Sequence, residues 1–247
     1  MKLNTVICGD IFNVMPKIED KSVYMILTDM PYNTTACSWD KEVIPLDKLW
    51  EGFKRIIKDN GAIVMTGKQP FTSKLILSNL EMFRYELIWE KTRAGNNMQV
   101  KKQPSAIHEN ILVFYKNQPT YNEITFIVDE KYIDKRKSIN NSYYSKGHYS
   151  GIMKRGKDTG IRHPQSILSF NSEWSKGMHP TQKPVDLFGY LIKTYTNKGD
   201  TVFDGFAGSG TTGVACHNLN RKFILIEKEE KYCKIAERRL SQGVLKI

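Results

Sequence analysis

Residues Thr201 to Glu227 have the sequence TVFDGFAGSGTTGVACHNLNRKFILIE, and the architecture of the whole chain follows from it. The apolar run Thr201–Phe203 predicts a short strand ending at Asp204, because its residues are β-branched or aromatic. Four glycines follow within nine positions, then a helix-like segment, then a second apolar run, Phe223–Ile226, that ends at Glu227. This order of strand, glycine-rich turn, helix and strand predicts a parallel sheet whose carboxyl edge binds a nucleotide-like ligand.

The glycines and the terminal acid of this stretch suit a ligand site. The glycines are Gly205, Gly208, Gly210 and Gly213. Glycine reaches positive φ and lets a ligand approach the backbone without meeting a Cβ. The carboxylate of Glu227, at the end of the second strand, can accept hydrogen bonds from both hydroxyls of a ribose. A tight turn in an ordinary α/β core is the alternative interpretation.

The type of ligand is a separate question. Residues 208–213 satisfy the pattern G-x-G-x-x-G, so a dinucleotide-binding enzyme has to be considered. Asp204 argues against it, because a carboxylate at the end of the strand repels a pyrophosphate but can hold a cationic amino acid. No G-x-x-x-x-G-K-[ST] pattern occurs, which disfavours a P-loop nucleoside triphosphatase.

The length and composition predict one soluble, intracellular domain with a charge excess that favours association with polyanions. A chain of 247 residues can bury one large core, and its 37 Lys and Arg exceed its 26 Asp and Glu, a net charge of +11. The four cysteines are scattered, so reduced thiols in the cytoplasm are expected, and no His or Cys spacing indicates a metal ion. The first residues lack a signal-peptide pattern, and no apolar run is long enough to span a membrane.

Strands alternating with helices along the chain predict a doubly wound, mostly parallel sheet. Apolar residues spaced three and four positions apart predict an amphipathic helix over 46–57, and Asn60-Gly61 is expected to end it. Further helices are expected over 11–15, 70–80, 185–195 and 232–240, and further strands over 3–8, 23–27, 62–65, 86–89 and 111–115.

The glycine-rich stretch resembles the cofactor loop of S-adenosylmethionine-dependent methyltransferases. Upstream of it, His179-Pro180-Thr181-Gln182-Lys183-Pro184, a helix and Gly199-Asp200 closely resemble the segment before this loop in amino-directed DNA methyltransferases of the β group. Asp29-Met30-Pro31-Tyr32 resembles the D-P-P-Y motif of the same enzymes, with Met30 in the second position. The catalytic motif comes first and the cofactor loop last, which resembles the motif order of the β group.

The resemblance covers residues 1–116 and 177–243 and fails over 117–176; its motifs together are highly specific. Gly9-Asp10 matches the family's position for an acid near the cofactor adenine, and Trp89-Glu90-Lys91 and His108-Glu109-Asn110 resemble further typical stretches. It implies a Rossmann-like, S-adenosylmethionine-binding α/β fold in a single methyltransferase domain. The catalytic half is expected over 1–116, a target-recognition insertion over about 117–177, and the cofactor-binding half over 178–247.

The resemblance also implies the residues that hold the cofactor, S-adenosyl-L-methionine. The glycine loop and Glu227 are expected around its methionine and ribose parts, Asp10 near its adenine, and Thr181 and Lys183 near its methionine end. The complete predicted set is Asp10, Thr181, Lys183, Asp204, Gly205, Phe206, Gly208, Ser209, Gly210, Thr211, Thr212 and Glu227.

The segment Asp29–Tyr32 follows a predicted strand and is therefore expected at the same sheet edge as the glycine loop. Methyl transfer to an exocyclic amine needs a nitrogen lone pair that is otherwise conjugated into the base ring. The Asp29 carboxylate and the Met30 carbonyl can accept the two N–H bonds and favour a pyramidal nitrogen. Pro31 rigidifies the turn, and Tyr32 offers a flat face on which an extruded base can stack. A strand-to-loop turn with a buried aromatic is the alternative.

The stretch without family resemblance is rich in basic and aromatic residues. Between Lys131 and His163 it contains nine Lys and Arg against two Asp, with four interleaved tyrosines, a mixture expected where phosphates and bases are both contacted. A second basic run flanks Gly95-Asn96-Asn97 and is expected to order on DNA; a solvated, lysine-rich insertion is the alternative. The predicted DNA contacts are Lys91, Arg93, Lys101, Lys102, Lys135, Arg136, Lys137, Lys154, Arg155 and Arg162.

Together these inferences predict a DNA methyltransferase that modifies the N6 amino group of a flipped adenine. By resemblance, an Asp in the first motif position is more typical of adenine enzymes, whereas Ser is frequent in N4-cytosine enzymes of this motif order. N4-cytosine methylation is the first alternative, and C5-cytosine chemistry is disfavoured because no Pro-Cys pair occurs. More remote are a protein or RNA amino-methyltransferase, an NAD(P)-dependent oxidoreductase and a nucleic-acid-binding module with a vestigial methyltransferase fold. Double-stranded DNA is the expected partner, and no association with a membrane is expected. A homodimer is left open.

Overall fold

The chain divides into two compact units. The computed structural model describes residues 1–32, 44–92, 100–133, 138–140, 152–154, 158–172 and 182–242, and for 138–140 and 152–154 it describes the backbone only. The main unit comprises Met1–Asn122 and Ser166–Ile247, and the inserted unit comprises Glu123–Gln165. No helix among the described residues is long and apolar enough to cross a membrane.

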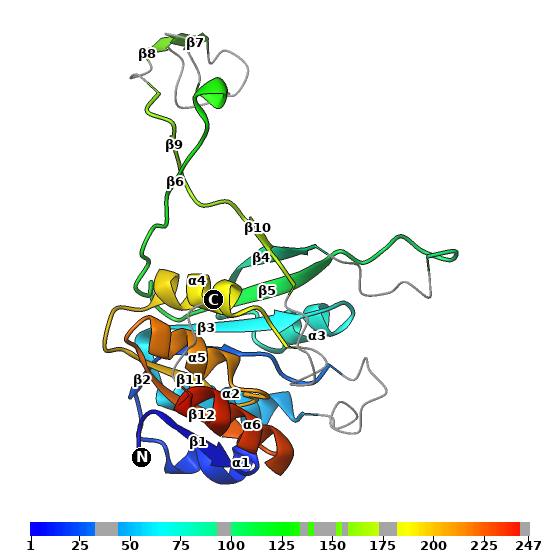
Figure 1. Cartoon of the computed structure of the whole chain (residues 1–247), viewed down its shortest axis with the longest axis vertical. Coiled ribbons are helices and arrows are strands. Elements are labelled where there is room, and N and C mark those ends of the chain that lie inside the picture. The colour runs from blue at the N-terminus through cyan, green and yellow to red at the C-terminus, as the bar shows by residue number, and fades with distance from the viewer. Residues whose placement is uncertain are drawn as a thin grey trace. The chain divides into compact units, whose positions relative to one another are not determined.

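An eight-stranded, mostly parallel sheet forms the centre of the main unit (Figure 1). β5 is the one antiparallel member, pairing in that sense with β3 and β4, while every other neighbouring pair is parallel. In spatial order the strands are β1 (Thr5–Cys8), β12 (Lys222–Glu227), β11 (Thr201–Asp204), β2 (Val23–Thr28), β3 (Ile57–Gly67), β5 (His108–Phe114), β4 (Phe83–Lys91) and β10 (Ile167–Phe170).

Helices cover both faces of this sheet, and two hydrophobic clusters separate them from it. One face carries α1 (Ile11–Val14), the following 3₁₀ turn (Met15–Lys17), α2 (Leu46–Ile56) and α3 (Phe71–Ser78). The other face carries α4 (Val185–Tyr195), α5 (Thr211–Asn218) and α6 (Glu230–Ser241). The prediction of a doubly wound, mostly parallel α/β sheet is confirmed.

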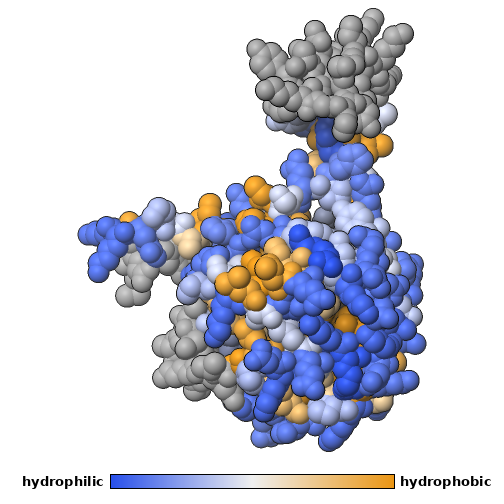
Figure 2. Space-filling view, turned by 180° about the vertical axis from the view of Figure 1, so that it is seen from behind, coloured by the Kyte–Doolittle hydropathy of each residue, from blue (hydrophilic) through white to orange (hydrophobic). Residues whose placement is uncertain are grey.

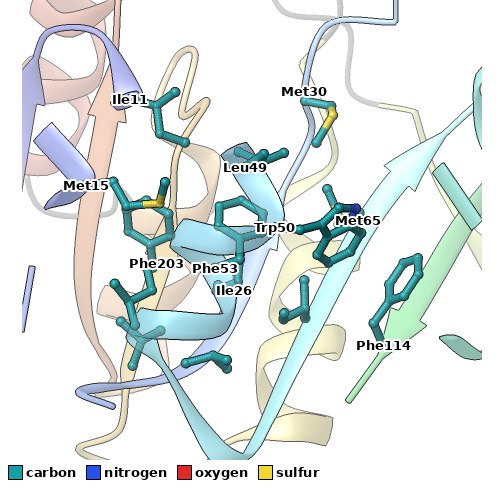
Figure 3. Close-up of a cluster of buried hydrophobic side chains, with 14 of the residues drawn as sticks. Ile11, Met15, Ile26, Met30, Leu49, Trp50, Phe53, Met65, Phe114 and Phe203 are labelled. Carbon is teal, nitrogen blue, oxygen red and sulfur yellow. The ribbon is translucent and has the colours of Figure 1, made fainter. Parts of the chain in front are cut away.

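The core on the α2 face follows from the spacing of apolar residues along that helix. Leu46, Leu49, Trp50, Phe53 and Ile56 are all buried, because residues three and four apart lie on one side of a helix. The Trp50 ring lies 5.0 Å from that of Phe114 in β5, and the Phe53 ring 6.1 Å from that of Phe203 in β11 (Figure 3). These contacts anchor α2 directly beneath the central strands.

The prediction that Asn60-Gly61 ends α2 is wrong, because both residues lie inside β3. Ile57 already has an extended backbone, with φ −72° and ψ 140°, and pairs with Val23 of β2. The register between β2 and β3 shifts after Val23, and a Cβ at Gly61 would lie 2.9 Å from the Tyr24 carbonyl oxygen. The glycine therefore permits a close approach of two strands, a tertiary demand that a helix-capping pattern does not detect.

The strands β11 and β2 lie side by side and mark the point where the winding of the sheet reverses. From β11 the chain proceeds through α5 to β12, whereas from β2 it proceeds through α2, on the opposite face, to β3. Ligands of open α/β sheets bind outside the carboxyl ends of the strands at such a point. The segment after β2 and the glycine loop after β11 both begin there.

The inserted unit consists of two short antiparallel strand pairs and one 3₁₀ turn among its described residues. β6 (Phe126–Ile127) pairs with β9 (Ile161–Arg162), and β7 (Ser138–Asn140) pairs with β8 (Ile152–Lys154). The 3₁₀ turn covers Glu130–Tyr132. β10, directly after this unit, was not predicted; it pairs in parallel with β4 and so belongs to the main sheet.

The surface seen in Figure 2 is largely hydrophilic, with a few hydrophobic patches. Charged side chains account for 26% of the sequence, and most of them have to lie at the surface because burial of an unpaired charge is costly. The large exposed apolar side chains of the main unit include Leu77, in the last turn of α3, and Leu80, two residues after that helix.

Candidate active site

A hydrogen bond joins the two segments at the winding reversal. The Thr28 hydroxyl, at the end of β2, donates to Asp204 Oδ1, at the end of β11, over 2.8 Å. Both residues are buried, so the bond is shielded from water. It places Asp29, the next residue, directly beside the start of the glycine loop, as the sequence predicted from the ends of the two strands.

The carboxylate of Asp29 is held by three side chains. Lys183 Nζ lies 2.5 Å from Oδ2, while the hydroxyls of Tyr32 and Thr66 both donate to Oδ1. A carboxylate has about four lone-pair positions, and these three described donors leave one on Oδ2. The Asp29 side chain is 21% exposed, so it is only partly shielded from solvent.

Tyr32 is a neutral donor in this arrangement. Its ring stacks on Phe71 with centroids 5.3 Å apart, and its hydroxyl lies 2.8 Å from Thr66 Oγ1. Desolvation and the negative charges of Asp29 and Glu109 raise the pKa of Tyr32 well above its ordinary value. The phenol therefore keeps its proton and helps to fix the orientation of the Asp29 carboxylate.

Lys183 connects Asp29 to a second buried acid, Glu109. The Lys183 ammonium lies 3.4 Å from Glu109 Oε2, and Lys91 forms an ion pair with Glu109 Oε1. Burial favours the neutral amine, but the charges of Asp29 and Glu109 outweigh it and raise the pKa of Lys183. Glu109 was noted in the sequence only as part of a family-like stretch. It reaches this edge because β5 is antiparallel, so its first residues lie beside the last residues of β3 and β4.

The glycine loop wraps around the carboxylate of Glu227. Gly208 N donates to Glu227 Oε2 over 2.7 Å, and Glu229 N donates to Oε1 over 2.8 Å. Gly208 and Gly210 have φ values of 52° and 81°, and a Cβ at Gly210 would lie 2.9 Å from Ala236 Cβ. The loop conformation therefore requires glycine at both positions. Burial raises the pKa of Glu227, and backbone hydrogen bonds from Glu229, Gly208 and Lys228 oppose the shift.

Asp204, predicted as a cofactor contact, organises the loop from inside. Its side chain is buried and accepts hydrogen bonds from Thr28, from Phe206 N at 3.0 Å and from Thr212 Oγ1 at 2.5 Å. Burial raises its pKa to about 6 against the opposing effect of these bonds. All of its described partners are neutral groups of the protein, so the structure gives it the role of a tie between β11, the loop and α5.

The remaining predicted cofactor residues lie around the same edge. Asp10 follows β1 and caps α1, accepting from Phe12 N at 2.8 Å. Ser209 donates to Gln182 Oε1 at 2.9 Å, which joins the segment before α4 to the glycine loop. Arg239 of α6, which sequence reasoning missed, donates to the Ser209 carbonyl over 2.7 Å. Gly205, Phe206, Thr211 and Thr212 complete the loop and the start of α5, and Thr181 lies outside the described residues.

The predicted DNA contacts have different environments. Lys101 and Lys102 are exposed, whereas Lys91 is largely buried against Glu109. In the inserted unit the Arg162 guanidinium binds both oxygens of Asp158 at 2.8 Å. Arg93, Lys135, Arg136, Lys137 and Arg155 lie outside the described residues, and Lys154 is described by its backbone in β8. Among the described residues, no group of three His, Cys, Asp or Glu side chains is placed to hold a metal ion.

Solved structures of DNA methyltransferases share this fold. M1.HpyAVI in complex with S-adenosylmethionine superposes with a TM-score of 0.63 at 23% identity, covering 95% of this chain and 98% of that one. The PvuII DNA methyltransferase, described as cytosine-N4-specific, gives a TM-score of 0.65 at 16% identity, covering 96% and 92%. The architecture is therefore the S-adenosylmethionine-dependent methyltransferase fold.

The chain belongs to the DNA methylase family of N6 and N4 amino-methyltransferases, whose family model matches residues 23–238. One curated relative is the DNA adenine methyltransferase YhdJ of Escherichia coli, 30% identical over 96% of this chain and 82% of its own length. Another is the type II methyltransferase M2.LlaDCHI of Lactococcus lactis, 29% identical over 95% of this chain and 88% of its own length. The predicted family is confirmed, and this chain is an amino-directed DNA methyltransferase.

Proposed function

We propose that this chain transfers a methyl group from S-adenosyl-L-methionine to the N6 amino group of an adenine flipped out of double-stranded DNA. The observation that carries the proposal is the position of Asp29: its carboxylate lies at the winding reversal, next to the glycine loop, with one acceptor position beyond those its described partners use. An amine held there would lie within reach of a methyl donor bound at the loop.

The cofactor is S-adenosyl-L-methionine, and the residues at this edge fit it. Glu227 accepts backbone N–H groups from Gly208, Glu229 and Lys228, and the acceptor position that remains on its carboxylate can bind a ribose hydroxyl. The turns at Gly208 and Gly210 present backbone without a Cβ. We assign Asp10 to the adenine side, and Lys183 with the glycine loop to the methionine side. When bound, the cofactor supplies an electrophilic methyl group on a sulfonium.

The chain's own residues prepare the amine for attack. Asp29 Oδ2 and the Met30 carbonyl accept hydrogen bonds from the two N–H groups, which favours a pyramidal nitrogen whose lone pair is no longer conjugated with the ring. The Met30 side chain is buried in the core beside Leu49 and Met65 (Figure 3), so methionine replaces the usual proline of the motif without occupying the site. The amine nitrogen would become cationic when it takes the methyl group, with the bonding electron pair of the departing group left on the donor. The negative charge of Asp29 would stabilise that cation until its N–H proton passes to water.

The test is the product formed by the wild type and by Asp29→Ala. DNA methylated by the purified wild type and digested to nucleosides should contain N6-methyladenine, detected by mass spectrometry. Asp29→Ala should form no product while still binding cofactor and DNA, because the loss falls on transition-state geometry. Asp47→Ala, an exposed acid at the start of α2, is the matched control and should stay active. Full activity of Asp29→Ala would remove Asp29 from the mechanism.

Methylation of cytosine N4 is the second candidate. Both targets present an NH₂ group on an aromatic ring. The chain shares its fold with a cytosine-N4-specific enzyme, and it has a DNA adenine methyltransferase among its relatives. The Asp in the first motif position favours adenine. N4-methylcytosine in the digest, without N6-methyladenine, would overturn the choice of base and leave the role of Asp29 intact.

We assign target recognition to the inserted unit and to the basic residues near it in sequence. The support is the excess of Lys and Arg between Lys131 and His163 and the exposure of Lys101 and Lys102. The slope of log binding constant against log salt concentration falls by roughly 0.9 for each phosphate contact removed, so it measures how many of these cations reach DNA. A homodimer stays a prediction, which light scattering of the purified protein would check.

A further inference from the structure

The active site contains a row of four alternating charges, and the proposed function gives a role only to two of them, Asp29 in the reaction and Lys183 at the cofactor. We define the charge row as Lys91, Glu109, Lys183 and Asp29. Its members come from four separate segments: the end of β4, the start of β5, the segment before α4 and the residue after β2. Two of the contacts converge on one ammonium, since Lys183 Nζ lies 2.5 Å from Asp29 Oδ2 and 3.4 Å from Glu109 Oε2.

The charge row is largely shielded from solvent. The side chains of Lys91, Glu109 and Lys183 are 16%, 12% and 6% exposed. Glu109 Oε2 is buried and has no hydrogen-bond donor among the described residues, so its 3.4 Å contact with Lys183 is an ion pair without hydrogen-bond geometry. Charges in such surroundings interact far more strongly than in water. The row as a whole is neutral, and removing the charge of Lys91, Glu109 or Lys183 leaves an uncompensated charge in the row that ends at Asp29.

This balance bears on methyl transfer because the attacking nitrogen becomes cationic next to Asp29. The Lys183 ammonium, bonded to the same carboxylate, repels that developing charge and competes for the Asp29 oxygen. A second carboxylate on the far side of Lys183 offsets both effects. Glu109 is the group in that position, and Lys91 in turn moderates the charge of Glu109.

We infer that Glu109 is a positioning residue for catalysis, holding the Lys183 ammonium between two carboxylates so that Asp29 stays available to the amine. Glu109 acts through Lys183 and needs no contact with substrate or cofactor. The inference rests on the proposed role of Asp29. The groups that face Lys183 among the described residues are Asp29, Glu109 and the Tyr32 ring, whose centroid lies 5.8 Å from Nζ.

The two outer members of the row separate this role from a purely structural one. Glu109→Gln and Lys91→Met break the same ion pair, so a structural role predicts that both lower activity. The electrostatic role predicts opposite signs, because Glu109→Gln leaves an extra positive charge beside the reacting amine and Lys91→Met leaves an extra negative one. The measurement is the single-turnover methylation rate at saturating DNA and cofactor, which removes effects on binding.

We expect Glu109→Gln to lower this rate about tenfold or more, equivalent to about 1.4 kcal/mol in the barrier. Lys91→Met should raise the rate above that of the wild type, and the double variant, again neutral, should recover to within about threefold of the wild-type rate. Glu86→Gln is the matched control. Glu86 lies on β4, outside the charge row, and accepts a hydrogen bond from Nδ2 of Asn110, the residue after Glu109, at 3.0 Å. This variant should not change the rate.

Parallel losses in Glu109→Gln and Lys91→Met, or a wild-type rate in Glu109→Gln, would overturn the inference. Thermal unfolding of each variant shows whether a lost rate reflects lost structure. If Asp29→Ala is inactive while Glu109→Gln is unaffected, the charge-row inference alone fails. If Asp29→Ala is fully active, the proposed function of Asp29 fails, whatever Glu109 does.

Discussion

Two pairs of acids lie at the same edge of the sheet, one pair buried and the other largely shielded from solvent, and their partners differ in kind. Asp204 and Glu227 end β11 and β12 and are held by hydroxyls and backbone N–H groups, all of them neutral. Asp29 and Glu109 lie after β2 and at the start of β5, and lysine ammoniums bind both. We refer to these as the neutral-partner pair and the lysine-paired acids.

The difference in partners sets the charge that each pair can carry. Burial raises the pKa of Asp204 to about 6 and shifts that of Glu227 in the same direction, because dipoles compensate a buried charge incompletely. The negative charges of the lysine-paired acids, Asp29 and Glu109, instead raise the pKa of Lys183, although burial alone would lower it. Within the neutral-partner pair, Glu227 is therefore suited to its proposed role of binding uncharged ligand hydroxyls, and among the lysine-paired acids Asp29 is suited to its proposed role beside an amine that becomes cationic.

Removal of Lys183, the cation that both lysine-paired acids share, should have the largest effect on the stability of the protein. Lys183→Met leaves Asp29 and Glu109 as buried like charges without the ammonium between them. We expect a loss of about 3–5 kcal/mol in the free energy of unfolding, the usual cost of removing one partner of a buried ion pair. Denaturant unfolding at neutral pH measures it. Lys193→Met, on the exposed face of α4, should change stability little; an equal change in both variants would show that the lysine-paired acids do not depend on Lys183.

In the neutral-partner pair, loss of the Asp204 charge should instead increase the stability of the protein at neutral pH. The folded-state pKa of Asp204, about 6, lies above its ordinary value of 3.8. Between these values the folded protein binds a proton that the unfolded chain has released, so stability falls as pH rises from about 4 to 6 and stays reduced above it. At about 1.4 kcal/mol per pKa unit the penalty is about 3 kcal/mol.

Asp204→Asn should remove this penalty. The amide oxygen can keep the bonds from Thr28 and Phe206 N, and the Thr212 hydroxyl can rotate to accept from the amide NH₂. The unfolding free energy of the variant minus that of the wild type should therefore increase by about 3 kcal/mol between pH 4 and pH 7. Asp186→Asn, an exposed acid in the first turn of α4, controls for the loss of one negative charge. A difference that is constant with pH would place the Asp204 pKa at its ordinary value.

The smallest expected effect is on cofactor affinity, and it tests the assignment of Glu227 to the ribose hydroxyls. Glu227→Ala removes the acceptor proposed for the ribose hydroxyls and should weaken S-adenosylmethionine binding by about 1–3 kcal/mol. Isothermal calorimetry measures the change. Glu230→Ala, three residues on and paired with Lys234 at the surface, is the control and should bind normally. Unchanged affinity of Glu227→Ala would take this acid out of the cofactor site.

Much of the fold could be predicted because its signals are local. The glycines at 208 and 210 adopt positive φ, the apolar spacing over 46–56 forms the buried face of α2, and the strands around both motifs end where their acids begin. The errors arose where a local signal met a tertiary demand. Asn60-Gly61 has the composition of a helix end, yet pairing with β2 draws it into a strand. β10 is short and was missed because only its pairing with β4 stabilises it as a strand.

By itself, the sequence determined the family, the α/β sheet and the presence of Asp29 and the glycine loop at one sheet edge, because motif spacing and periodicity encode the backbone around each residue. Only the tertiary structure decided the partners of those groups. Asp29 and Lys183 are 154 residues apart in the chain, and Glu109 meets them because β5 runs against its neighbours. Whether a buried acid is held by a hydroxyl or by an ammonium depends on such long-range pairing, and that choice sets its charge and the chemistry it can perform.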